Sequence, residues 1–231
     1  MNQPASILIK TVTSRMFAQN CYIASLPGRA DCVVIDPGLE PGRILTVMRD
    51  GGLEPAAILC THGHADHIAG NAALKKSFPR APLIIGEGDA EKLADAELNL
   101  SSLFSAPLVS PPADRLVREG DIIAAAGMKF LVRETPGHSS GHVVFISQDQ
   151  QPCVVFGGDV LFQGSVGRTD FPDGNTEQLY RSIREKLFTL PADTQVYPGH
   201  GEPTTIGEEL ESNPYVGRHS LSPSPPVRGP G

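Results

Sequence analysis

The sequence predicts a layered α/β domain, and two kinds of pattern support this prediction. The first is a set of short apolar runs that lack polar alternation and are rich in β-branched residues, as is typical of strands buried on both faces. These runs are 32–35, 57–60, 83–85, 143–146 and 153–156. The second is a pair of helical apolar stripes between and after these runs. Strands mixed with covering helices indicate sheets with helices packed on them.

The two helices are predicted from apolar spacing and from residues that begin or end helices. The first stripe consists of Ile44, Leu45 and Met48. Its helix is expected to end at Gly51–Gly52, because glycine favours the backbone conformation that follows a helix. The second stripe consists of Leu179, Ile183 and Leu187. Asn175 is expected to cap this helix, with Gln178 three residues later and Pro191 beyond its end.

Length and composition indicate one folded domain followed by a tail. The chain has 231 residues, of which 40% are hydrophobic and 19% charged, so it can bury a core. Gly and Pro are frequent, and ten of the last fifteen residues are Gly, Ser or Pro. Such a segment buries too little apolar area to offset its ordering entropy. We therefore expect a domain over residues 1–216 and a disordered tail over residues 217–231.

Charge and apolar patterning exclude several classes of partner. The net charge is −7, which argues against nucleic acid and anionic membranes as partners. No apolar run approaches the roughly 18 residues that span a bilayer, and the N-terminus lacks the pattern of a signal peptide. The four cysteines are widely spaced in apolar stretches and are expected to be buried, reduced thiols: Cys21, Cys32, Cys60 and Cys153. A soluble, cytoplasmic protein is expected, and its oligomeric state is not predicted.

The histidines are placed in glycine-flanked turns rather than in core patterns. Six of the seven occur in three turns, at 61–67, 135–142 and 197–201. A fourth turn, 156–159, ends a buried strand with a carboxylate. A single histidine is most often a surface residue or a hydrogen-bonded core residue. Random placement rarely produces the spacing H-x-H-x-D-H seen at 62–67, so the sequence predicts a metal site.

Imidazole and carboxylate bind zinc, iron or manganese, and the spacing allows two metal ions. His62 and His64 could point to one ion and His138 could complete that trio. Asp66 and His67 could point to a second ion with His200, and the two oxygens of Asp159 could bridge both. The turns at 62, 159 and 200 follow strands, where sites collect in open α/β layers. Two such ions generate hydroxide from a bridging water near neutral pH, which predicts hydrolysis.

These residues resemble the metallo-β-lactamase superfamily, whose hallmark here is His62-x-His64-x-Asp66-His67. The resemblance extends over residues 7–216 and implies a four-layer αβ/βα sandwich with the metals at one edge of the sheets. Within the superfamily the chain is similar to glyoxalase II-like hydrolases (hydroxyacylglutathione hydrolases), particularly the short bacterial form. The segments that carry this likeness are 34–38, 135–138, 158–162, 167–171 and 197–201.

The resemblance implies a ligand set for two divalent ions, zinc first, with iron or manganese as alternatives. It implies that metal 1 is bound by His62, His64 and His138. It implies that metal 2 is bound by Asp66, His67 and His200, with Asp159 as the bridge. Asp66 and Asp159 are accordingly expected to be catalytic as well as metal-binding.

Other polar residues near these motifs are expected to support the ligands. Asp36 matches an acidic residue of the family and is expected to orient a ligand histidine. Arg168 and Asp170 are expected to form a supporting ion pair, and His142 to support the site rather than bind metal. Lys75 and Lys76 are interpreted as a solvated helix face, and His219 is assigned no role.

The resemblance implies a hydrolase of small-molecule thioesters, with S-lactoylglutathione-type substrates first, through a metal-bridging hydroxide. Enzymes of this fold that hydrolyse β-lactams usually place a cysteine where Asp159 stands, so antibiotic hydrolysis is not expected. Because the residues after 216 are rich in Pro and Ser, we expect no counterpart of the helical C-terminal domain with which glyoxalase II binds glutathione, which leaves glutathione specificity open.

Two functions other than thioester hydrolysis are also compatible with the sequence. A mononuclear iron persulfide (sulfur) dioxygenase of the same superfamily would use His62, His138 and Asp159 as a facial triad. The glycines on both sides of His200 favour the hydrolase over this branch. The other alternative is a metal-binding scaffold without turnover, which the intact ligand set argues against.

Overall fold

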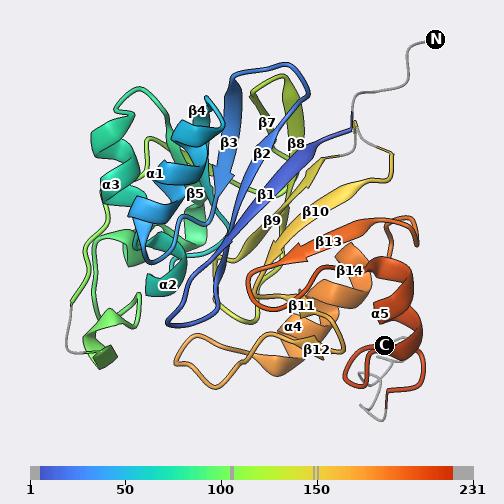
Figure 1. Ribbon diagram of the computed structural model, residues 1–231. Coiled ribbons are helices and arrows are strands. Elements are labelled where there is room, and N and C mark those ends of the chain that lie inside the picture. The colour runs from blue at the N-terminus through green and yellow to red at the C-terminus, as the bar shows by residue number, and fades with distance from the viewer. Residues whose placement is uncertain (1–5, 105–106, 148, 150, 221–231) are drawn as a thin grey trace.

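The computed structural model describes residues 6–104, 107–147, 149 and 151–220. These residues form two six-stranded sheets packed face to face, with helices on the outer face of each sheet (Figure 1). The predicted α/β class and its four-layer αβ/βα arrangement are confirmed.

The first sheet is antiparallel at its N-terminal end and parallel beyond it. In order across the sheet its strands are β1 (Leu8–Thr13), β2 (Asn20–Ser25), β3 (Asp31–Ile35), β4 (Glu54–Cys60), β5 (Leu83–Gly86) and β6 (Arg115–Val117). From β3 to β6 all pairs are parallel. The carboxyl ends of β3, β4 and β5 therefore lie at one edge of the sheet, and the loops that follow them start side by side.

The second sheet is mostly antiparallel. Its strands, in order, are β14 (Thr204–Thr205), β13 (Gln195–Pro198), β10 (Val154–Gly158), β9 (Val143–Ser147), β8 (Met128–Glu134) and β7 (Ile122–Ala125). The pair β10–β13 is parallel, so these two strands also end at one edge. A small hairpin, β11 (Leu161–Phe162) with β12 (Ser165–Val166), follows β10.

The helices cover the outer faces of the sheets (Figure 1). On the first sheet these are α1 (Pro41–Asp50), α2 (Ala65–Ile68) and α3 (Asn71–Ser77), with the 3₁₀ segments η1 (Glu87–Leu93) and η2 (Ser101–Phe104) in the loops after β5. On the second sheet they are α4 (Thr176–Ser182), which continues into the π turn η3 (Ile183–Leu187), and α5 (Ile206–Ser212).

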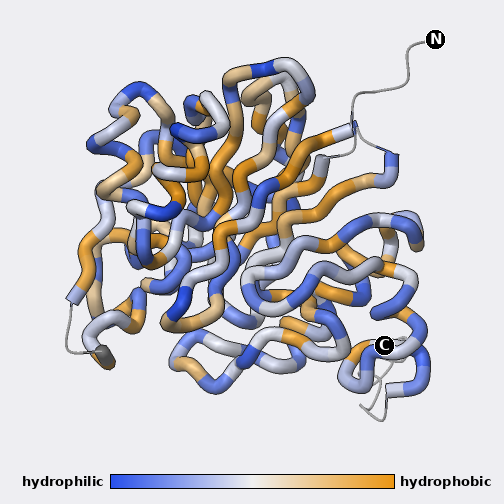
Figure 2. Tube along the Cα trace, in the orientation of Figure 1, coloured by the Kyte–Doolittle hydropathy of each residue, from blue (hydrophilic) through white to orange (hydrophobic). Residues whose placement is uncertain are grey.

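Strand β3 shows why the apolar runs become internal strands. Val33 and Ile35 face the core between the two sheets, whereas Cys32 and Val34 face the helices. Successive side chains of a strand point to opposite faces, so a strand between two apolar layers needs apolar residues at every position. Figure 2 shows the same concentration of hydrophobic residues along the central strands.

All five predicted strands are present, and both predicted helices begin or end as expected. Gly51 follows the last residue of α1. The Asn175 side-chain oxygen accepts a hydrogen bond from the Gln178 backbone N–H at 2.9 Å. The stripe after Asn175 is buried against the second sheet, although its last turn is a π turn rather than an α-helix. All four cysteines are buried and free.

Two expectations about the periphery need revision. Lys75 is not simply solvated, because its ammonium pairs with Asp114 at 2.7 Å and donates to the Ala81 carbonyl. The segment expected to be a tail from residue 217 begins folded: the Gly217 and Arg218 backbone N–H groups donate to carbonyls of α5 and of Asn213 just after it. Residues 221–231 lie outside the described residues, so disorder there stays a prediction. No helix in the described part of the chain is long and apolar enough to cross a membrane.

Candidate metal centre

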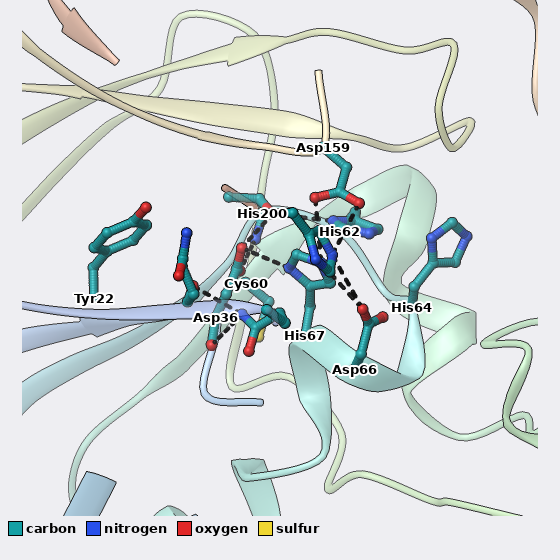
Figure 3. A network of polar contacts seen from close by, with 12 residues as sticks. Tyr22, Asp36, Cys60, His62, His64, Asp66, His67, Asp159 and His200 are labelled. Atoms are coloured by element: carbon teal, nitrogen blue, oxygen red, sulfur yellow. Dashed lines mark hydrogen bonds and ion pairs between the residues drawn. The ribbon is translucent and has the colours of Figure 1, made fainter. Parts of the chain in front are cut away.

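The predicted ligands meet at the edge where the parallel strands of both sheets end. His62 and His64 follow β4, and Asp66 and His67 lie on the short helix α2 directly after them. From the second sheet, His138 comes from the loop after β8, Asp159 follows β10 and His200 follows β13. All seven predicted ligands are therefore brought together between the two sheets, and most of them are seen in Figure 3.

Three of these side chains form what we call the buried half: His62, His64 and His138. They are 0%, 4% and 2% exposed, respectively. His64 Nδ1 and His138 Nε2 are 2.9 Å apart, and the three imidazoles bring one nitrogen each to within 4.8 Å of one another. Three nitrogen atoms so close together, on side chains shielded from solvent, form a compact donor set for one cation.

The other three form what we call the open half: Asp66, His67 and His200. Their ligand atoms also lie within 4.8 Å of one another, with His200 Nε2 3.3 Å from Asp66 Oδ2. Whereas the His67 side chain is completely buried, those of Asp66 and His200 are 23% and 28% exposed. The open half is thus the side of the cluster that solvent reaches.

Asp159 contacts side chains of both halves. Its Oδ2 is 3.6 Å from His138 Nε2 and 3.5 Å from His200 Nε2, and its Oδ1 is 3.4 Å from His67 Nε2. One carboxylate therefore contacts ligands of both halves, as a bridge between two ions requires.

The donor set fits metal ions by two independent observations. Three buried atoms that face the cluster have no hydrogen-bond partner: Nε2 of His62, Nε2 of His67 and Oδ1 of Asp159. Leaving buried polar atoms unsatisfied is costly unless a ligand completes them. In addition, two atoms bound at about 2.1 Å to one ion with tetrahedral geometry lie about 3.4 Å apart. Several separations between ligand atoms of the cluster, such as 2.9 Å for His64 and His138 and 3.7 Å for Asp66 and His67, are close to that value.

Asp36 holds ligands from the opposite side of the rings. This carboxylate, 2% exposed, accepts hydrogen bonds from the Thr61 backbone N–H and hydroxyl, both at 2.7 Å, and lies 3.0 Å from His67 Nδ1. The Thr61 hydroxyl is in turn 3.1 Å from His62 Nδ1. Because Nδ1 of both histidines is engaged, Nε2 is left facing the cluster. Asp36 also lies near His62 and His67 as a third ligand-type group, but its oxygens are already occupied.

Other imidazoles are fixed by backbone carbonyls. His138 Nδ1 is 2.8 Å from the Arg168 carbonyl, and His200 Nδ1 is 3.0 Å from the Phe17 carbonyl. His142 differs from both, because its two ring nitrogens are engaged: Nδ1 lies 3.0 Å from the Thr135 hydroxyl, and Nε2 accepts from the Asp159 backbone N–H. His142 therefore has no free nitrogen for a metal and instead holds the backbone of Asp159.

Arg168 contacts the site through its backbone rather than through its charge. Its guanidinium forms two 2.7 Å hydrogen bonds with Asp170 and lies over the Phe171 ring, 4.3 Å from the ring centroid. Both charged side chains are more than half exposed. The expected ion pair is present, but it lies on the surface of the loop that carries the carbonyl for His138. His219, 81% exposed, lies far along the chain beside Glu211.

The pKa shifts of the ligand-type side chains also differ between the buried half and the open half. Burial and neighbouring imidazoles lower the pKa of His62, and burial with His138 lowers that of His64, so both are neutral at pH 7. Burial opposes a charge on His67 too, but the carboxylates of Asp159 and Asp66 raise its pKa. Burial would raise the pKa of Asp159, but the charge of His67 holds it well below its usual range. The neutral imidazoles and ionised carboxylates are the forms that bind metals.

The sequence did not point to several residues that position the cluster. Thr61 is adjacent to the motif but was not singled out. Asp89, Lys92 and Asp173 contact the ligand loops from distant parts of the chain. Asn20, at the start of β2, donates its side-chain amide to the Gly201 carbonyl beside His200. No local motif marks these residues, because each acts through a contact that only the folded chain creates.

Comparison with known proteins agrees with this geometry. The family model described as the metallo-beta-lactamase superfamily matches residues 15–200, which include every predicted ligand. The chain belongs to the metallo-β-lactamase superfamily. Among curated proteins, hydroxyacylglutathione hydrolase GloC of Haemophilus influenzae is 36% identical over 215 residues, covering 92% of this chain and 99% of GloC.

Solved structures of the superfamily superpose on most of the chain. The B3 metallo-β-lactamase BLEG-1 has a TM-score of 0.86 at 36% identity, over 90% of this chain and 99% of its own. TTHA1623 in a di-iron-bound form has a TM-score of 0.77 at 35% identity, over 89% and 99%. ETHE1 from Myxococcus xanthus has a TM-score of 0.73 at 31% identity, over 90% and 84%. The names of these superfamily members describe different proteins, so membership of the superfamily alone does not specify the reaction.

Proposed function

We propose that the protein is a dinuclear metal-dependent hydrolase of thioesters, of the glyoxalase II-like kind. The observation that carries the proposal is the cluster of seven buried or half-buried ligand-type side chains with three unpartnered atoms facing inward. His62, His64 and His138 would hold one ion and Asp66, His67 and His200 the other, with Asp159 contacting both. The similarity to GloC over nearly its whole length supports the thioester class. The di-iron form of TTHA1623 supports two ions and makes iron a candidate beside zinc and manganese.

Two bound ions would supply a hydroxide near neutral pH and a positive charge for the carbonyl oxygen of the substrate. The side chains of the protein would then orient the metal ligands, supply the negative charge that binds the ions, and accept a proton. Asp66 is the carboxylate placed for proton transfer, because its side chain is partly exposed at the open half. Although burial opposes its charge, His67 and His200 lower its pKa, so it is ionised at neutral pH. No protein nucleophile is needed, and a thiolate leaves with little acid assistance.

The open half defines the direction from which substrate enters. The proposed ligand side chains are most exposed there, at 23% for Asp66 and 28% for His200 against 11% for Asp159, and on the buried half the Phe171 ring lies 5.3 Å from that of His64. A small thioester is expected to approach Asp66 and His200 and to place its carbonyl over the cluster beside Asp159. Phe162 lies 6.3 Å from the His200 ring, so an apolar group is expected to border the acyl chain or the leaving thiol.

The proposal is tested by measuring kcat/KM of the metal-loaded protein on a matched substrate panel. The panel consists of S-lactoylglutathione, the same acyl group on a thiol without glutathione, a chromogenic cephalosporin and glutathione persulfide. We expect hydrolysis of the glutathione thioester at least about 100-fold faster than of the cephalosporin. The second thioester reports whether glutathione itself is recognised. Hydrolysis of neither thioester would contradict the proposal.

Two other activities have specific support and are measured by the same panel. The likeness to BLEG-1 is a reason to assay β-lactams, against the expectation based on Asp159. The persulfide dioxygenase alternative would use His62, His138 and Asp159, and the 3.6 Å between His138 Nε2 and Asp159 Oδ2 permits a shared ion. Oxygen consumption with glutathione persulfide, by protein that carries a single iron, would favour that alternative over thioester hydrolysis.

A further inference from the structure

A buried charged network lies behind the buried half of the cluster, outside the predicted ligands. Asp89, on η1, is 0% exposed and Lys92, one turn later, is 6% exposed. Lys92 Nζ is 3.0 Å from Asp89 Oδ1 and 2.6 Å from Asp173 Oδ2. Charges are rarely buried to this degree unless they are paired and fully hydrogen-bonded, and such pairs are weak contributors to stability. A buried network of this kind therefore calls for a role besides stability.

The carboxylate of Asp89 joins two loops that carry metal ligands. Its Oδ2 accepts hydrogen bonds from the Gly63 backbone N–H and the Ser139 hydroxyl, both at 2.8 Å. Its Oδ1 accepts from the Gly141 backbone N–H, also at 2.8 Å. Gly63 lies between His62 and His64, whereas Ser139 and Gly141 follow His138. With Lys92 as the fourth partner, the hydrogen-bonding capacity of this carboxylate is fully used.

Asp173 extends the same network to a third loop. Its Oδ2 accepts from the Ser140 backbone N–H at 2.9 Å as well as from Lys92. Asp173 belongs to the segment whose Arg168 carbonyl lies 2.8 Å from His138 Nδ1. The loops at 62–64, 138–142 and 167–175 are thus fastened to one lysine–carboxylate group.

The loop at 62–64 packs closely against η1. A Cβ atom added at Gly63 would lie 2.5 Å from the Lys92 Cβ, closer than side-chain atoms approach. The glycine between the two histidines is therefore needed for close approach to Lys92, in addition to any need for a turn. The 62–64 loop is therefore in direct packing contact with Lys92 of the network.

We propose that Asp89, Lys92 and Asp173 are positioning residues that set the spacing of His62, His64 and His138 and thereby the metal affinity of the buried half. The inference rests on the ligand set proposed above but not on the substrate. The open half has different supports, namely Asp36, the Phe17 carbonyl and Asn20, so the network is expected to act on one of two binding events.

The test compares Asp89→Asn and Asp173→Asn with Glu209→Gln as a matched control. Glu209 is also a buried carboxylate, 2% exposed, and accepts hydrogen bonds from the Thr204 hydroxyl, the Gly164 N–H and the Asn213 amide. Its partners carry no ligand of the cluster. Zinc affinity of the metal-free protein is measured by competition with a chromophoric chelator, and thermal unfolding of the same samples is followed in parallel. His138→Ala and His200→Ala assign the two binding events to the buried and open halves.

Asp89→Asn is expected to weaken the buried-half event about 10- to 100-fold, and Asp173→Asn about three- to tenfold, as is typical when groups that orient metal ligands are lost. The open-half event stays within about twofold, and Glu209→Gln changes neither event while lowering the melting temperature. If Asp89→Asn does not fold, Asp173→Asn decides, because its side chain is 31% exposed and its loss is better tolerated.

The inference is overturned if Asp173→Asn leaves the buried-half affinity unchanged, or if both events weaken equally in the network variants and in the control. A wild-type protein that binds a single ion would contradict the dinuclear function. The effect of the variants on that single ion would then still decide whether the network positions the ligands.

Discussion

The two halves of the cluster are built differently, although each contributes three ligand-type side chains. The buried half consists of imidazoles alone, is at most 4% exposed and is fastened by Asp89, Lys92 and Asp173. The open half contains a carboxylate, has two side chains about one-quarter exposed, and is held by Asp36 and by the Phe17 carbonyl. Asp159 contacts both halves.

This difference indicates a division of work within one site. A rigid, dry donor set favours retention of an ion, because its ligands are already oriented and lose little freedom on binding. A donor set open to solvent admits water and substrate, and its carboxylate can accept a proton. We therefore expect the buried half to bind its ion more tightly and the open half to meet the substrate.

The largest effect on kcat is expected for a substitution of Asp159, which contacts both halves. Asp159→Ala should lower kcat by more than about 100-fold, since the loss of this carboxylate disturbs both ions. Steady-state kinetics at saturating metal measure the change, and circular dichroism confirms that the variant is folded. Near-wild-type turnover would contradict a bridge between the halves.

Removing one proposed ligand from each half tests whether the two halves bind metal with different affinities. His138→Ala should weaken the tighter of the two metal-binding events by more than about 100-fold, whereas His200→Ala should leave that event within about threefold. Both variants should lose most activity. Chelator competition separates the two affinities, and a reversed pattern would assign the tighter ion to the open half.

Asp36→Asn should act mainly on the open half. The substitution keeps the size of the side chain but removes the negative charge beside His67 Nδ1, 3.0 Å away. The open-half affinity and kcat/KM are each expected to fall about 10-fold, while the buried-half affinity changes less. An equal loss in both halves would show that Thr61 transmits the change to His62 as strongly as Asp36 acts on His67.

The pH dependence of the free energy of unfolding measures how much the charge of Asp173 contributes to stability. Burial opposes ionisation, but hydrogen bonds from Lys92 and Ser140 lower the pKa of Asp173 to about 2. With an unfolded-state pKa near 3.9, its ionised form stabilises the folded chain above about pH 4, and this contribution is lost as pH falls toward about 2. The difference in unfolding free energy between wild type and Asp173→Asn, from urea titrations, should therefore shrink over that interval. A difference independent of pH would contradict this linkage.

The smallest effect is expected for Arg168→Ala. Its guanidinium pairs with Asp170 on the surface, and exposed pairs of this kind contribute little to stability. His138 is held by the Arg168 carbonyl, which alanine retains. We expect the melting temperature to stay within about 2 °C and kcat within about threefold of wild type. A large rise in KM alone would instead show that the guanidinium contacts the substrate.

The sequence was sufficient for the parts of the molecule whose signals are local. Continuous apolar runs identify β3 and the other strands buried on both faces, and H-x-H-x-D-H predicts four side chains that the structure places in the cluster. Strand β8 contains no such run, because Lys129 and other polar residues alternate with its buried residues, so the apolar runs do not predict it.

The supports of the buried half could not be predicted in the same way. Asp89 is 26 residues from Gly63 and 52 from Gly141, and Lys92 is 81 residues from Asp173. In the sequence these residues are ordinary charges on a surface-like segment. Only the packing of η1 against both ligand loops buries them and gives them partners.

The most direct test of two unlike halves around one bridging aspartate is the metal content of the protein purified without added metal or chelator, followed by stepwise titration of the metal-free chain. We predict two ions per chain that bind with clearly different affinities, the weaker of which is lost in His200→Ala. A single ion per chain, or two ions of equal affinity that both variants weaken alike, would contradict the account.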